Sequence, residues 1–141
     1  MQIGVDSERA VDDRRVFVVD DDEITSAALQ FMLHDEIETH EITSLEAAYK
    51  KAKDWPPSVL LLGIGIVKSK GIEVLKEIHA NIADLKIILV ADTATDPLAQ
   101  ECLKNGVNSI LPKPLTIEKA RQKVDAQLGR KVKLAIPVVV M

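Results

Sequence analysis

The sequence has one cysteine and no long apolar run, and each shortage excludes a class of protein. A single cysteine, Cys102, cannot form a disulfide within the chain. No apolar stretch approaches the ~20 residues that cross a bilayer, so we expect no membrane partner. Residues 1–13 contain four acids, where a secretory leader needs a basic start and an apolar centre. We therefore expect a cytoplasmic protein.

The chain also lacks an excess of basic residues. It has 18 Lys and Arg against 22 Asp and Glu, a net charge of −4, which argues against a general nucleic-acid binder. Basic residues gather between Lys119 and Lys133, but no helix-turn-helix pattern follows them, so we interpret them as a solvated surface. With 141 residues, 47% of them hydrophobic, the chain is long enough to bury a core as one domain.

Apolar segments that alternate with helical patterns are the main feature that is present. Runs without polar alternation favour strands buried on both faces. The predicted strands lie at 16–19, 37–42, 59–62, 86–90 and 108–111, the second being polar enough for a sheet edge. Strand-helix-strand crossovers require parallel strands, so five strands and five helices predict an α/β, doubly wound parallel sheet.

The helices are predicted from spacing and from capping residues. The first has Ile24, Ala27, Ala28 and Phe31 at the spacing of one apolar face and runs to about residue 34. The second starts at Thr43, which forms a capping box with Glu46. Gly71 opens the third, Asp96 and Pro97 open the fourth, and the fifth runs from Thr116 to Leu128 with Gly129 as its stop.

Three consecutive acids, Asp20, Asp21 and Asp22, follow the first predicted strand. Open α/β sheets bind ligands at the carboxyl ends of their strands, so these acids are candidate site residues. Acids before a helix also serve as N-caps and as partners of the helix dipole, which is the structural alternative. The three histidines have no second ligand at metal spacing, and Cys102 lies on a helix face expected to be buried.

Several short motifs, in order and at the right distances, resemble the receiver domains of two-component response regulators. They are the acids after the first strand, Pro57 before the apolar run 59–62, Gly71 at the start of a helix, Gly106 at the end of one, and Lys113–Pro114 after the last strand. The resemblance covers residues 14–129. It implies the flavodoxin-like, CheY-like fold with strand order 2-1-3-4-5.

The resemblance also implies a chemistry, the transfer of a phosphoryl group from a histidine kinase to an aspartate. In the family an acid pair and the acceptor aspartate hold Mg²⁺, a hard cation that prefers oxygen ligands. Asp20 and Asp21 match the acid pair. Lys113 matches the lysine that neutralises the phosphoryl oxygens, and the bond to the following proline is typically cis in the family.

Three positions depart from the family pattern. Gly63 stands where the acceptor aspartate belongs, and glycine cannot be a nucleophile. Ala91 stands where receivers carry a Thr or Ser hydroxyl, and Ile110 where many carry the Tyr or Phe that moves on activation. Together these losses indicate a pseudo-receiver, with Asp20, Asp21 and Lys113 left as a residual acidic pocket. We expect Lys113 to become the main counter-charge of the acids, with weak Mg²⁺ binding or no cofactor.

The residues leave two classes of function open. The first is a signalling module, not an enzyme, that binds a protein partner without phosphorylation, the partner being a histidine kinase, an output protein or a second copy. The second is a working receiver that accepts a phosphoryl group from a histidine kinase with Mg²⁺, with Ser58, Ser69 or Thr93 as poorly placed substitute acceptors. A nucleotide or flavin binder is disfavoured, because the loop after the first strand is acidic where phosphates need glycines and backbone amides.

The predicted domain organisation has three parts. Residues 1–13 form an N-terminal arm, residues 14–129 a receiver-like domain, and residues 130–141 an apolar C-terminal tail. The tail contains Val132, Leu134, Ala135, Ile136 and four more apolar residues. Such a segment is an aggregation hazard in water, so we expect it to be buried. It folds back on this domain, pairs with a sheet edge, docks on a second subunit, or begins an effector domain of a longer protein.

Overall fold

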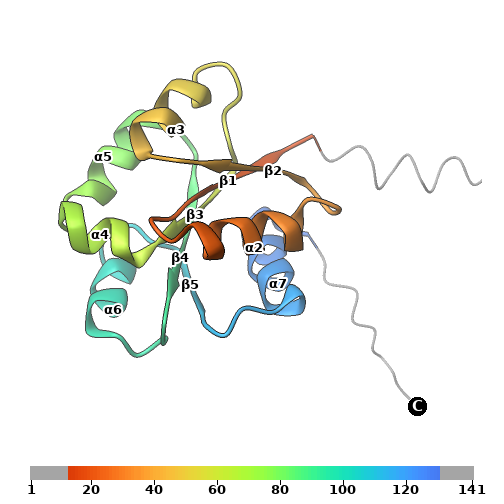
Figure 1. Cartoon of the computed structure of the whole chain (residues 1–141). Helices are drawn as coiled ribbons and strands as arrows, with labels where there is room; N and C mark the ends of the chain where they lie inside the picture. The colour runs from red at the N-terminus through yellow and green to blue at the C-terminus, as the bar shows by residue number, and fades with distance from the viewer. Residues whose placement is uncertain (1–12, 131–141) are drawn as a thin grey trace, which may run out of the picture.

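A parallel sheet of five strands forms the centre of the protein in the computed structural model, which describes residues 13–130 (Figure 1). Its strands are β1 (Arg15–Val19), β2 (Glu38–Ile42), β3 (Val59–Gly63), β4 (Lys86–Ala91) and β5 (Ser109–Pro112). Their order is β2-β1-β3-β4-β5, and every neighbouring pair is parallel. The predicted sheet is confirmed, including the place of β2 at an edge.

Six helices accompany the strands in the described part of the chain, one more than predicted. They are α2 (Glu23–Leu33), α3 (Leu45–Ala52), α4 (Ile64–Lys70), α5 (Val74–Asn81), α6 (Pro97–Leu103) and α7 (Ile117–Leu128). The additional helix, α4, begins directly after β3, in a segment that we predicted to be a loop. Val67 fixes this helix because it is buried in the core, and Ile64 and Ile66 pack beside it.

Alternate residues of the strands point to two separate cores. Val16 and Val18 pack with Leu29 of α2 and Val124 of α7 on one face of the sheet. Phe17 enters the core on the other face, which α3, α4, α5 and α6 cover. Burial on both faces explains why β1, β3 and β4 are apolar without alternation.

The buried face of α2 differs from the predicted one. Leu29 and Leu33 face the sheet, together with Thr25 and Ser26. The predicted apolar face is turned outward instead, with Ile24 80% and Phe31 66% exposed. Two apolar faces compete in this sequence, and the two leucines, one turn apart, decide the orientation because they fill the space between β1 and α7.

The helix ends agree with the sequence at two places and differ at two. Gly71, predicted to open a helix, instead ends α4 with φ 90°, and α5 begins at Val74. Asp96 caps α6 through the amide of Leu98 at 2.9 Å, with Pro97 in the first turn, and Gly129 ends α7 with φ 74°, as predicted. The cap of α3 is Ser44 and not Thr43. Its Oγ accepts from the amide of Ala47 at 3.1 Å, so the predicted capping box does not form.

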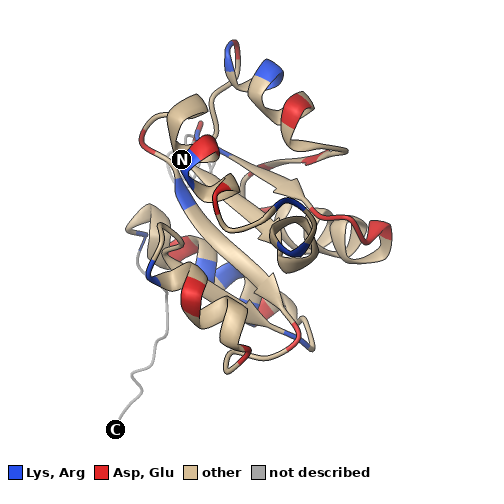
Figure 2. Cartoon of the chain, turned by 90° about the vertical axis from the view of Figure 1, so that its left-hand side faces the viewer, with Lys and Arg blue, Asp and Glu red and all other residues tan. Residues whose placement is uncertain are grey.

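Residues 1–12 and 131–141 lie outside the described part, so the predictions for the arm and for nearly all of the tail cannot be compared with it. None of the described helices is both long and apolar enough to span a membrane. In the view of Figure 2, basic and acidic positions are interspersed along the described part of the ribbon.

Candidate functional site

The candidate site residues meet at the carboxyl edge of the sheet. Asp20 follows β1, Gly63 ends β3, Ala91 ends β4 and Lys113 follows β5. The register pairs Val19 of β1 with residue 62 of β3, and the last residues of β4 and β5 lie side by side. The fold therefore brings the predicted positions to one edge, where doubly wound sheets place their sites.

At this edge the Asp20 carboxyl group occupies the space that a side chain on Gly63 would need. A Cβ atom added to Gly63 would overlap all three terminal atoms of the Asp20 side chain. The backbone of Gly63, with φ −70° and ψ 137°, is one that any residue adopts. Any larger residue at this position would therefore force the Asp20 carboxyl group to move, whereas the backbone conformation itself does not call for glycine.

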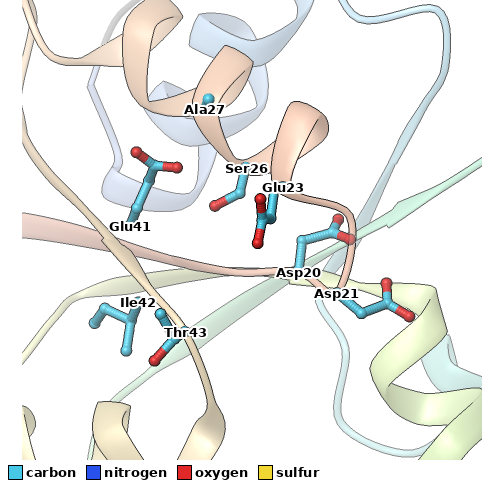
Figure 3. A pocket seen from close by; sticks show the side chains of 8 residues that line it. All are labelled: Asp20, Asp21, Glu23, Ser26, Ala27, Glu41, Ile42 and Thr43. Carbon is cyan, nitrogen blue, oxygen red and sulfur yellow. The ribbon is translucent and has the colours of Figure 1, made fainter.

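The Asp21 carboxyl group lies against a second glycine, Gly65. A Cβ atom added to Gly65, in the first turn of α4, would overlap the Asp21 carboxyl group. Figure 3 shows the two acids side by side after β1, with Asp21 directed toward the neighbouring helix. Each acid of the pair thus lies against a glycine, and α4, which the sequence did not predict, supplies the second one.

The environment of Asp20 disfavours its charged form. Partial burial is the main cause and raises the pKa of Asp20 from 3.8 to about 6. The amide of Asp22 donates to Asp20 Oδ1 at 2.9 Å and acts in the opposite direction, whereas neighbouring Asp21 raises the value further. Lys113 is the weakest of these influences. The acid is therefore close to half protonated near pH 6.

Lys113 has a different partner from the one expected. Its Nζ lies 3.8 Å from Asp92 Oδ1, an exposed carboxylate at the end of β4. The charge of Lys113 also lowers the pKa of Asp20, so the expectation that Lys113 is the main counter-charge of the acid pair stays a prediction. The Lys113–Pro114 peptide bond is cis, as the resemblance implied. Lys70, at the end of α4, pairs with Glu46 at 3.6 Å and not with the acid pair.

Asp22 has the structural role that was the alternative for all three acids. Its Oδ1 accepts from the amide of Ile24 at 3.0 Å, and its Oδ2 accepts from the Thr25 hydroxyl at 3.0 Å. The Thr25 hydroxyl is the largest cause that lowers the pKa of Asp22. The Asp22 carboxylate is the N-cap of α2, and Asp22 contacts the acid pair through its backbone amide.

The two altered switch positions are both buried. Ala91 is 1% exposed and Ile110 7% exposed. Alanine offers no hydroxyl to a ligand at the sheet edge, and isoleucine has no aromatic ring. Ile110 packs in the core beneath α6. These side chains serve packing and provide no group that interacts with a phosphoryl oxygen.

A pocket of about 500 Å³ opens beside the acid pair, on the side of β2 (Figure 3). It is lined by residues of the β1–α2 turn, of α2 and of the end of β2: Asp20, Asp21, Glu23, Ser26, Ala27, Glu41, Ile42 and Thr43. Four carboxylates give it an acidic wall. Sequence reasoning identified only the first two, because Glu41 is brought to this place by the pairing of β2 with β1.

The acid pair does not fit a tight Mg²⁺ site. Mg²⁺ needs several oxygens in near-octahedral geometry. The third carboxylate is missing at Gly63, and the Asp20 carboxyl group fills the space from which it would project. Among the described residues no group of three or more His, Cys, Asp or Glu side chains gathers closely enough to hold a metal ion.

The order of the strands, the two helical layers and the acids at the sheet edge define a flavodoxin-like α/β protein of the CheY-like type. The response regulator receiver domain family matches residues 16–125, which is most of the chain. The protein belongs to this family.

Three relatives of known annotation show the extent of the likeness. The C4-dicarboxylate transport transcriptional regulatory protein DctD of Pseudomonas aeruginosa is 30% identical over 71% of this chain and 22% of its own length. The transcriptional regulatory protein FixJ of Azorhizobium caulinodans is 28% identical over 82% of this chain and 55% of its own length. The chain thus spans about half or less of these regulators. The probable chemotaxis protein CheY of Rhizobium etli is 28% identical, and 92% of it is covered.

Solved structures confirm the fold. A response regulator from Thermotoga maritima superposes with a TM-score of 0.73 at 16% identity, covering 83% of this chain and 98% of that one. The beryllofluoride-activated NtrC4 receiver domain dimer superposes with a TM-score of 0.70 at 25% identity, covering 82% of this chain and 96% of that one.

Proposed function

We propose that this receiver domain is a pseudo-receiver, a signalling module that binds protein partners without being phosphorylated. The observation that carries the proposal is that the Asp20 carboxyl group occupies the space next to Gly63. The acceptor position has no side chain, and the space from which an acceptor would project holds another carboxyl group. An in-line attack on a phosphoryl donor requires a nucleophile at that point, and Gly63 offers none.

The surroundings support the same proposal. Ala91 and Ile110 cannot change their contacts in response to a phosphoryl group, because they lack the hydroxyl and the ring that would interact differently in two states. Lys113 is engaged with Asp92. The module acts as a binding partner and not as an enzyme, with Mg²⁺ bound weakly if it binds.

The partner is a protein of the signalling pathway, a histidine kinase or an output protein, in the cytoplasm. We place the contact on the surface formed by α6, β5 and α7, where Leu103 and Ile117 are exposed. A homodimer through this surface fits the proposal too, and a receiver domain dimer is known for NtrC4.

The second candidate function is a phosphorylatable receiver with a substitute acceptor. The structure favours Asp20 for that role over Ser58, Ser69 or Thr93, because its carboxyl group lies beside the position of the missing acceptor. Asp20 Oδ1 already accepts from the amide of Asp22 at 2.9 Å, which holds this carboxyl group in the turn after β1, so we rank this function second.

One experiment separates the two functions. The full chain is incubated with acetyl phosphate and Mg²⁺, and the intact mass is measured, with a receiver that has its acceptor aspartate as a positive control. No added phosphoryl mass is expected. A mass gain in the wild type that Asp20→Asn abolishes would establish the second function, and a gain that persists in Asp20→Asn would place the acceptor elsewhere. Either gain would refute the pseudo-receiver.

A further inference from the structure

An apolar stripe runs along the outer side of α2. It consists of Ile24, Ala27 and Phe31, spaced by one turn of helix, and we call it the α2 stripe. Ile24 and Phe31 are the two most exposed large hydrophobic side chains of the described part. Their side of the helix is opposite the face with Leu29 and Leu33, which packs on the sheet, so no described element covers it.

The described part of the chain ends beside the same helix. Arg130, its last residue, places its guanidinium 3.6 Å from Glu36 Oε1, just beyond the end of α2, and 3.1 Å from Asp125 Oδ1. Arg121 of α7 also lies 3.7 Å from Glu36 and donates to the carbonyl of Met32 at 3.1 Å. These contacts fix the start of the tail at the C-terminal end of α2.

The residues that follow have the composition and the length to cover the stripe. The sequence continues as residues 131–141, which contain Lys131, Lys133 and eight apolar residues, seven of them aliphatic and one methionine. Ile24 lies about 10 Å from Phe31 along the helix axis. Eleven extended residues reach up to about 36 Å, which exceeds the length of the stripe severalfold.

We propose that residues 131–141 dock on the α2 stripe of their own chain, running from Phe31 toward Ile24. A tether of this length holds the tail at an effective concentration in the millimolar range, so a modest apolar contact suffices. A second copy of the protein is a poorer occupant. Two large side chains on one helix fall far short of the roughly 1,200 Å² that a stable interface between two proteins buries.

The test uses the full chain in solution. Nuclear Overhauser effects are sought between the ring protons of Phe31 and the methyl groups of the tail. Amide hydrogen exchange of the tail is then compared in wild type, Phe31→Ser and Ile24→Ser. Leu103→Ser is the matched control, because Leu103 is also exposed but lies on α6, on the opposite face of the sheet. These substitutions are all on the surface, so the fold is expected to persist.

The proposal requires tail amides that exchange at least about tenfold more slowly in wild type and in Leu103→Ser than in the two stripe variants, a ratio that corresponds to about 1.4 kcal/mol. It also requires the Overhauser contacts in a sample that sedimentation shows to be monomeric. Equal exchange rates in all four proteins, or no contacts to Phe31, would overturn it. Protection that rises with protein concentration would assign the stripe to a second copy and would also overturn it.

Discussion

At the scale of single residues, the closeness of Asp20 and Gly63 is the feature with the most consequences. The two residues come from different strands and lie more than 40 positions apart, yet a methyl group on one overlaps the carboxyl group of the other. No sequence pattern reports such a contact, because it depends on which way one short side chain turns. Gly63 was identified by its place in the family pattern, whereas its reason for being glycine in this fold came from the structure.

Gly63→Ala should destabilise the protein, because the new methyl group forces Asp20 to rotate and to lose the amide of Asp22. The expected loss is about 1–2 kcal/mol of unfolding free energy, typical of an overpacked site. In the Asp20→Ala variant the space beside Gly63 is free, so Gly63→Ala should lower the unfolding free energy by a smaller amount. The difference between the two losses, the coupling energy, should exceed about 0.5 kcal/mol. Urea unfolding of the four proteins of this cycle measures it. Equal costs in both backgrounds would mean that the two side chains do not compete for space.

Asp20 should also make stability depend on pH in a predictable direction. Burial raises the pKa of Asp20 to about 6 in the folded protein, above its ordinary 3.8, so folding favours the protonated carboxyl group. Its contribution is complete below pH 4 and is lost as the pH rises through 6. Asp20→Asn, which cannot ionise, should therefore gain stability relative to wild type between pH 4 and pH 7.

The gain should be on the order of 1 kcal/mol, because solvent screens a half-exposed carboxylate. Urea unfolding of both proteins at several pH values is the measurement, and the difference between them cancels all other titrating groups. Parallel stability curves for the two proteins would show that Asp20 has an ordinary pKa.

At the scale of elements, the strands were predicted well and the helix faces less well. Strands buried on both faces, such as β1 and β3, have a composition that no other element shares. A helix face is ambiguous when two apolar sets fit the same spacing, as in α2, and only the packing of Leu29 and Leu33 against the sheet decides. The short helix α4 was not predicted, and the glycines Gly63 and Gly65 at its start are poor helix formers. These glycines leave space for the carboxyl groups of Asp20 and Asp21, which lie against them.

The cap of α3 gives a direct test at this scale. Ser44→Ala should lower the free energy of unfolding by about 1 kcal/mol, because it removes the hydroxyl that accepts from the amide of Ala47. Thr43→Ala is the matched control and should have a smaller effect, since Thr43 lines the pocket and caps no helix. The measurement is thermal or urea unfolding of each variant. A larger cost for Thr43→Ala would restore the predicted capping box.

At the scale of the whole molecule, alternation of strands and helices was enough to predict a doubly wound parallel sheet. The strand order came from the resemblance, which the family match supports, whereas the site edge followed from the acids at the carboxyl end of the first strand. The acidic pocket beside β2 could not be predicted, since its wall is assembled from β1, α2 and β2. The ion pair between Lys113 and Asp92 was not predicted, because it depends on how close the ends of the neighbouring strands β4 and β5 lie.

Gly63→Asp tests which parts of a receiver this molecule retains. An aspartate at position 63 must displace the Asp20 carboxyl group, which leaves three carboxylates at the sheet edge. We expect tighter Mg²⁺ binding, because the charge and number of oxygen ligands govern the affinity of a hard cation. We also expect slow phosphorylation by acetyl phosphate. Gly63→Asn is the control, since it makes the same steric demand without a carboxylate.

The Gly63→Asp variant, once phosphorylated, should still not undergo the conformational change of an activated receiver. Ala91 has no hydroxyl that contacts a phosphoryl group, and Ile110 has no ring to follow such a contact, so the two states of a receiver would differ little in energy. Amide chemical shifts should therefore change near residue 63 and stay constant along α6 and β5. The measurement combines intact mass with amide NMR spectra before and after phosphorylation. A phosphoryl mass on Gly63→Asn would place the acceptor elsewhere. Shift changes that spread through α6 and β5 would show that the switch survives without the hydroxyl and the ring.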